Sequence, residues 1–400
     1  MKHTLCFTLT AVISLLLIVA GTVLFGLPLL REIPSLSGMY VRAVVLSVEE
    51  TADGTSGNTD TVFRALLKSG PDKGTTVTAR QNADKSISYE TKTVAKNDTV
   101  ILSSPEESGL DGWYFVEYVR SDYLIVLTVV FFAALLLFGR MKGLKSALSL
   151  LYTVAAIFLV FIPAVLTGQS IYLWTAILGV FITAMTLLLV NGWTELTLSS
   201  VLGCLSGISL SAVLIVISEA ILHMSGYVDE SSIYLSFLVP DMKGILYAAI
   251  IIGAIGAIMD VAVNIAAALH ELALKTEQPT FSSLLASGFT IGRDILGTMT
   301  NTLILAYVGG SMCSVLLVLY YNASSPLQLF NRELIVSEVL QILIGSLALL
   351  LTIPASAAIS ALLFSRPSFQ LKKRAEAAEE TRDDFTDELN SMSGGSDETL

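Results

Sequence analysis

The stretch from Lys243 to His270 reads KGILYAAIIIGAIGAIMDVAVNIAAALH, and Asp260 is its only carboxylate. A helix needs about 20 mainly apolar residues to cross the hydrocarbon core of a bilayer, so this stretch is long enough to be a membrane span. A charged side chain at the centre of a span costs roughly 2.5–3.5 kcal/mol on insertion scales. Asp260 therefore requires polar surroundings, and it is the first candidate for a functional residue.

The composition of the whole chain also indicates a membrane protein. Of the 400 residues, 54% are hydrophobic and 14% are charged, whereas soluble domains carry about 25% charged residues. The net charge of −11 and the lack of a basic surface argue against nucleic acid as a partner. The three cysteines lie far apart and match no disulfide framework or metal-ligand spacing. We expect no metal and no cofactor.

Apolar runs of the required length recur along the chain. The first run comes after Lys2 and His3. It is too long for the apolar core of a signal peptide and has no clear cleavage site, so we expect an uncleaved span. We predict an α-helical polytopic membrane protein with about eight spans, near residues 7–30, 123–139, 147–166, 171–190, 196–222, 244–269, 295–321 and 334–364.

Residues 31–121 have a different character. Five short alternating runs are separated by clusters of Gly, Asp, Asn and Ser, which predicts a small β domain with the size of an OB-like barrel. We expect strands at residues 40–48, 61–68, 75–80, 99–102 and 113–119. The domains are then 1–30, the first span; 31–121, the β domain; 122–366, a seven-span bundle; and 367–400, an acidic tail that we expect to be disordered.

The basic residues of the short loops predict the orientation of the spans. Lys and Arg accumulate on the cytoplasmic side of membrane proteins. With the N-terminus inside, only Lys243 and Arg332 fall in short outer loops, and the inner side holds Arg140, Lys142, Lys145, Lys275, Arg293, Arg366, Lys372, Lys373 and Arg374. We expect a cytoplasmic N-terminus and C-terminus and an extracytoplasmic β domain.

Two polar stripes mark the candidate site. Helical positions three, four and seven apart share a face, so Gly253, Gly256, Ala257, Asp260 and Asn264 form a stripe. A second stripe in the next span holds Asp294, Gly297, Thr298, Asn301 and Thr302, with Arg293 at its start. We expect both stripes to line the interior of the bundle and to form a cation or proton path.

A structural alternative is that Asp260 and Arg293 form an ion pair while Asn and Thr side chains hold two helices together. Glu219, near the outer end of its span, is a candidate for an outer gate. An enzyme is not expected, because no metal-binding HExxH, Walker A or G-x-S-x-G motif is present.

The segment between the two striped spans, from His270 to Arg293, is too short for a span and too long for a turn. Phe281, Leu284, Leu285 and Phe289 share one helical face. We predict an interfacial helix with Pro279 as its first residue.

These two stripes lie in motifs that resemble a known family. GAIGAIMDVAVNIAAALHEL, at residues 253–272, and GRDILGTMTNTLILAYVGG, at residues 292–310, are similar to the YibE/F family of bacterial multi-pass membrane proteins. The resemblance covers about residues 40–366 and includes the small β domain. It implies a bacterial plasma-membrane location, and it marks Met259–Asp260 and Gly292–Asn301 as a signature without supplying a substrate.

The sequence leaves two functional hypotheses. The first is a transporter or ion-coupled permease for an unknown small solute or ion, in which Asp260 binds the coupling ion. Asn264, Asp294, Thr298 and Asn301 would then supply oxygen ligands, with Arg293 as gate or counter-ion. The second is a membrane scaffold or envelope sensor whose residues 31–121 bind an envelope protein.

Overall fold

The computed structural model describes residues 2–28, 40–53, 58–84, 92–103, 112–228, 230–239, 241–322, 325–367 and 369–371. The acidic tail and the basic residues 372–374 lie outside these ranges. Contacts divide the chain into two compact units, one formed by residues 1–29 with 144–400 and the other by residues 30–143.

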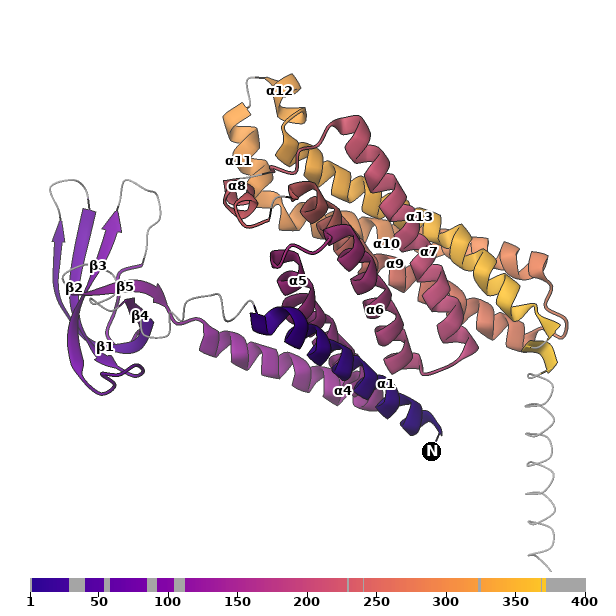
Figure 1. Ribbon diagram of the computed structural model, residues 1–400, viewed down its shortest axis with the longest axis horizontal. Coiled ribbons are helices and arrows are strands. Elements are labelled where there is room, and N and C mark those ends of the chain that lie inside the picture. Colours follow the sequence, from indigo (N-terminus) through magenta and orange to yellow (C-terminus); the bar gives the residue numbers. More distant parts are fainter. Residues whose placement is uncertain are drawn as a thin grey trace, which may run out of the picture. The chain divides into compact units, whose positions relative to one another are not determined.

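The β domain is a closed barrel of five strands in the order β1-β2-β3-β5-β4 (Figure 1). The strands are β1 Tyr40–Asp53, β2 Asn58–Leu67, β3 Thr76–Asp84, β4 Thr99–Ser103 and β5 Trp113–Tyr118. β1 pairs antiparallel with β2 and β4, and β3 pairs parallel with β5. All five predicted strands are confirmed; β1 and β3 end later than predicted, and β2 begins earlier.

Alternating side chains of the strands fill the interior of the barrel. Val45, Phe63, Ala79, Val100 and Leu102 are completely buried there, as expected for strands with one face toward a core. Bulges after Val45 and Val48 bend the long β1–β2 hairpin, which assists closure.

The rest of the described chain is helical. Its elements are α1 Lys2–Gly21, η1 Thr22–Gly26, α4 Ser121–Ala156, η2 Ile157–Phe161, α5 Ile162–Leu166, α6 Ile171–Asn191, α7 Glu195–Leu222, α8 Glu230–Ser236, α9 Met242–Lys275, α10 Phe281–Gly310, α11 Met312–Asn322, α12 Pro326–Phe330 and α13 Glu333–Phe364. η1 and η2 are single π-helical turns.

Six helices in the described chain are long and apolar enough to cross a membrane, or seven if the bent pair α10–α11 is one span. α4 and its continuation to Leu166 count once in that number, but Arg140 has a non-helical backbone, with φ 46° and ψ −126°. This break separates two apolar segments that the sequence predicted as two spans.

The centre of the helical unit is α9, which packs against α6, α7, α10 and α13. α7 and α13 lie side by side (Figure 1) and meet α9 at small residues. A Cβ placed on Gly207 of α7 would lie 2.1 Å from Thr352 Oγ1 and 2.7 Å from Ile258 Cγ2. Ser199 and Ser360 share a buried hydrogen bond of 2.7 Å. Small residues thus allow these three helices to approach closely.

The segment after α9 differs from the prediction. α10 begins at Phe281, with Thr280 as the N-cap that accepts a hydrogen bond from the Ser283 amide. Pro279 precedes the cap, so it is not the first helical residue. α10 then continues without a break to Gly310, and no separate interfacial helix is formed between Phe281 and Arg293.

Candidate functional site

The first polar stripe lies near the middle of α9. Gly253, Gly256, Asp260 and Asn264 are exposed on the surface of the chain. The opposite face, with Ile258, Val261, Ala262 and Ile265, is completely buried. The prediction that this stripe faces the interior of the bundle is therefore wrong for the single chain, because the Ile and Val face makes the contacts with the neighbouring helices.

The second stripe is exposed in the same way. Arg293, Asp294, Gly297, Thr298 and Asn301 are exposed, while Gly288 and Gly292 on the other side of α10 pack closely on Ala357 and Ile353 of α13. The Thr298 hydroxyl donates to Ile295 O at 3.0 Å, within its own helix. No described residue forms an ion pair with Asp260 or Arg293, so the alternative of an Asp260–Arg293 pair is not realised within one chain.

The two stripes lie on neighbouring helices that contact each other. A Cβ placed on Gly253 would lie 2.6 Å from Tyr307 Oη of α10, so one end of the α9 stripe reaches α10. We call the exposed set Gly256, Asp260 and Asn264 of α9 with Asp294, Gly297 and Asn301 of α10 the polar face.

A groove of about 420 Å³ runs beside this face, between α10 and α13. Gly297 and Asn301 belong to its lining, and Ser346 and Leu347 line it from α13. The Ser346 hydroxyl oxygen is buried and has no hydrogen-bond partner in the described chain. The groove therefore joins an unpaired hydroxyl to the polar face, and spacing along the sequence gave no indication of Ser346.

Glu219 belongs to a different cluster. It lies near the end of α7, where Tyr172, Tyr247, Asp241 and Lys243 are its electrostatic neighbours. The two tyrosine rings are 4.8 Å apart, and Glu219 Oε1 is buried without a hydrogen-bond partner in the described chain. Tyr247 and Asp260 are 13 residues apart on one helix, about 20 Å at 1.5 Å per residue. Glu219 is therefore not part of the polar face.

Glu333 is a residue that the sequence analysis missed. Its carboxylate accepts hydrogen bonds from the amides of Ser225 and Gly226 and from the Ser225 hydroxyl, at 2.6–2.7 Å. It thereby fixes the turn after α7 to the start of α13. No local pattern marks it, because its partners lie more than 100 residues earlier in the chain.

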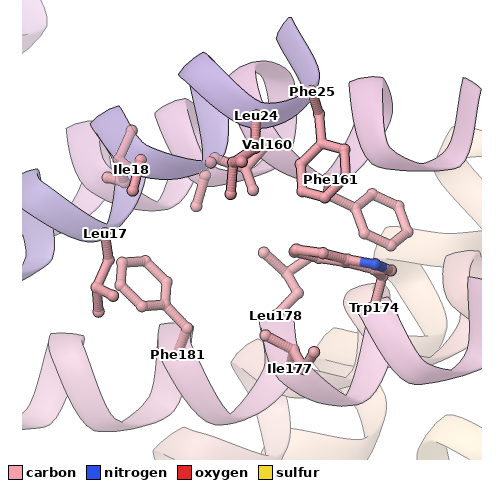
Figure 2. Close-up of a pocket in the computed structure, with 13 residues that line it drawn as sticks. Leu17, Ile18, Leu24, Phe25, Val160, Phe161, Trp174, Ile177, Leu178 and Phe181 are labelled. Carbon is pink, nitrogen blue, oxygen red and sulfur yellow. The ribbon is translucent and has the colours of Figure 1, made fainter. Parts of the chain in front are cut away.

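A separate pocket of the helical unit is lined almost wholly by apolar side chains. It measures about 270 Å³ and lies between α1, η2 and α6. Figure 2 shows that its labelled side chains are hydrocarbon, apart from the indole nitrogen of Trp174. Phe25 meets Trp174 edge to face, with ring centroids 5.0 Å apart. This pocket offers no oxygen ligands for an ion.

The comparisons with known proteins give a family and no closer relative. No curated protein and no solved structure matches the chain. A family model described as YibE/F-like protein matches residues 127–366, which is more than half of the 400 residues. The match contains α9 and α10 with their polar stripes, and it begins after the barrel. This membrane protein therefore belongs to the YibE/F-like family.

Proposed function

We propose that this protein is a transporter or ion-coupled permease of the bacterial plasma membrane that moves a small ion or solute along the polar face. Asp260 is the ion-binding carboxylate. Asn264, Asp294, Thr298 and Asn301 supply further oxygen atoms at neighbouring positions of α9 and α10. Oxygen ligands of this kind suit hard cations, and a carboxylate that gains and loses a proton suits proton coupling.

The observation that supports this most is the place of Asp260. It lies at the nineteenth of the 34 residues of α9, so it is near mid-helix, and ionisable groups at this depth are functional by default. The described chain provides no cation that pairs with it. A carboxylate that has no partner within the described chain is available to bind a mobile cation.

Arg293 and Glu219 take supporting roles in this proposal. Arg293 lies on the same face of α10 as Gly297, at the end nearer the loop to α9, and can act there as gate or counter-ion. Glu219, with Tyr172 and Tyr247, forms a polar cluster at the opposite end of the bundle. It serves as the entrance or exit of the path.

Charge movement in proteoliposomes tests the proposal. Purified protein is screened with protons, alkali and divalent cations, phosphate and amino acids, beside the variants Asp260→Asn and Glu271→Gln. Asp260→Asn keeps the size of the side chain and removes its charge. Glu271→Gln makes the same change at the exposed end of α9, outside the polar face.

A current or coupled flux is expected for the wild type and Glu271→Gln, and its loss by at least tenfold is expected for Asp260→Asn. Equal flux in all three proteins would remove Asp260 from the path. No flux for any substrate, with all proteins folded, would favour the second function.

That second function is a membrane scaffold or envelope sensor. The separate barrel favours it, because a domain with its own buried core can bind a partner without help from the helices. Asp260→Asn should then leave partner binding unchanged, as measured by cross-linking of envelope proteins to residues 40–118.

A further inference from the structure

We propose that a second copy of this chain covers the polar face, so that the site around Asp260 is completed by two copies. Only the statement that the covered face conducts an ion or solute rests on the proposed function. The association itself follows from the surface of the single chain and is tested separately.

The first observation is the contrast with the remaining helix surface. Exposed side chains of the other long helices are mostly Leu, Ile, Val and Phe, such as Leu173, Ile217 and Leu362. These suit contact with lipid. Asp260, Asn264 and Asp294 are also exposed but do not suit it, because lipid tails provide no hydrogen bonds. Another protein surface must cover them.

The second observation concerns two glycines of the polar face. A Cβ placed on Gly256 or Gly297 would meet no atom within 4 Å. The buried glycines Gly207, Gly288 and Gly292 behave differently, because neighbouring helices occupy the space beside them. Glycine inside a helix is destabilising relative to alanine, and within one chain nothing at these two positions requires it. Close approach by a helix of another molecule does.

The third observation is the groove beside α10. It is continuous with the polar face through Gly297 and Asn301, and it holds the unpaired Ser346 hydroxyl. A helix of a covering molecule would fill this groove beside Gly297 and Asn301.

Charge complementarity identifies the covering molecule as a second copy. A two-fold axis along the membrane normal makes the interface isologous and keeps each residue at the same depth in both copies. Arg293 of one copy then meets Asp294 of the other copy, and the reverse pair forms at the same time. The face carries both charges at adjacent positions, so it is complementary to itself.

Disulfide cross-linking in native membranes tests the inference. The background carries Cys6→Ala and Cys313→Ala, while Cys204 is completely buried and is kept. Gly256→Cys and Gly297→Cys are the probes, since both positions have free space. Ser209→Cys is the matched control. It is exposed on α7, its substitution is nearly isosteric, and the contact of Gly207 with Ile258 places it close to the depth of Gly256.

Oxidation with copper phenanthroline should link most of the Gly256→Cys and Gly297→Cys protein into a species of twice the chain mass. Ser209→Cys should remain a single chain. Arg293→Asp and Asp294→Arg, each made in the Gly297→Cys protein, should reduce the linked fraction several-fold. The double swap Arg293→Asp/Asp294→Arg should restore it.

Absence of linkage at both glycines in folded protein would overturn the inference, as would linkage to a different protein. Equal linkage of Ser209→Cys would also overturn it, because random collision would then account for the products. Linked dimers without any flux would support this inference while the proposed transport fails. Flux from protein that shows no linkage would leave the transport proposal standing and overturn only the dimer.

Discussion

At the scale of single residues, the glycines of α7 and α9 predict opposite responses to one added methyl group. Gly207→Ala places a carbon within 2.1 Å of Thr352 Oγ1, and overpacking of this kind costs about 1–3 kcal/mol. Gly256→Ala meets open space and should gain about 0.5–1 kcal/mol from helix propensity. Unfolding in dilute detergent, where copies are separated, measures both changes. A loss of stability for Gly256→Ala equal to that for Gly207→Ala would contradict the packing described for α9.

The residue scale also shows where sequence reasoning was sufficient and where it was not. Asp260 stands out because the residues around it are apolar. Which face of α9 turns inward could not be derived, because Leu and Ile are equally suited to lipid and to a protein core. In water, the polar side of an amphipathic helix must face the solvent. In a bilayer this rule does not hold, and the sequence prediction placed the α9 stripe in the interior of the bundle.

At the scale of elements, β5 and the segment after β3 predict a pH response of the barrel. Gln81 is buried and binds Lys92 O and the Val94 amide at 3.0 and 2.9 Å. The Tyr118 hydroxyl also donates to Lys92 O. Burial, and then the charge of Asp98, raise the pKa of Tyr118 above its usual value. In the unfolded chain a tyrosine loses its proton near pH ~10, before it does so in the barrel.

The barrel is therefore stabilised by the neutral Tyr118 side chain. This contribution to the free energy of unfolding is complete below pH ~10 and is lost as the pH rises toward the folded-state pKa of Tyr118. Guanidinium unfolding followed by Trp113 fluorescence, with Trp174→Phe and Trp193→Phe, should show barrel stability falling above that pH. Tyr118→Phe should lower stability at neutral pH and weaken the fall. Tyr40→Phe, at an exposed position of β1, should leave the fall unchanged. A pH profile that is the same for Tyr118→Phe and the wild type would disprove the assignment.

The elements themselves were largely predictable, since alternating apolar and polar residues predicted the five strands and long apolar runs predicted most of the long helices. Their interruptions and extensions were not. α10 continues through the expected interfacial segment because Gly288 and Gly292 pack on Ala357 and Ile353 of α13. That contact joins residues more than 60 positions apart, so no local pattern contains it. The 60° bend between α10 and α11 was missed as well.

At the scale of the whole molecule, most of the described basic residues of the helical unit lie at one end. Ser199 meets Ser360, Trp193 donates to Thr10 and Lys145 lies over the Phe7 ring. Gln370 donates to Pro279 O. These contacts place the end of α13, the start of α7 and the α9–α10 loop together, with Lys145, Lys275 and Arg366 nearby. Lys243 and Arg332 lie at the other end, where Glu333 binds the Ser225 turn.

This distribution predicts that the Lys275 end is cytoplasmic and that the barrel faces outward. Single cysteines at Gln278, Asn331 and Lys73, all exposed, report the sides in a Cys6→Ala/Cys313→Ala background. The cells are kept intact, except that an outer membrane, where present, is opened. An impermeant maleimide should then label Asn331→Cys and Lys73→Cys. It should reach Gln278→Cys only after the plasma membrane is permeabilised. Labelling of Gln278→Cys alone in intact cells would reverse the orientation. Labelling of Asn331→Cys without Lys73→Cys would place the barrel in the cytoplasm and require a different number of crossings between β5 and α6. The expected pattern keeps Arg293 nearer the cytoplasm than Asp260, so that an ion leaving Asp260 inward passes the arginine last.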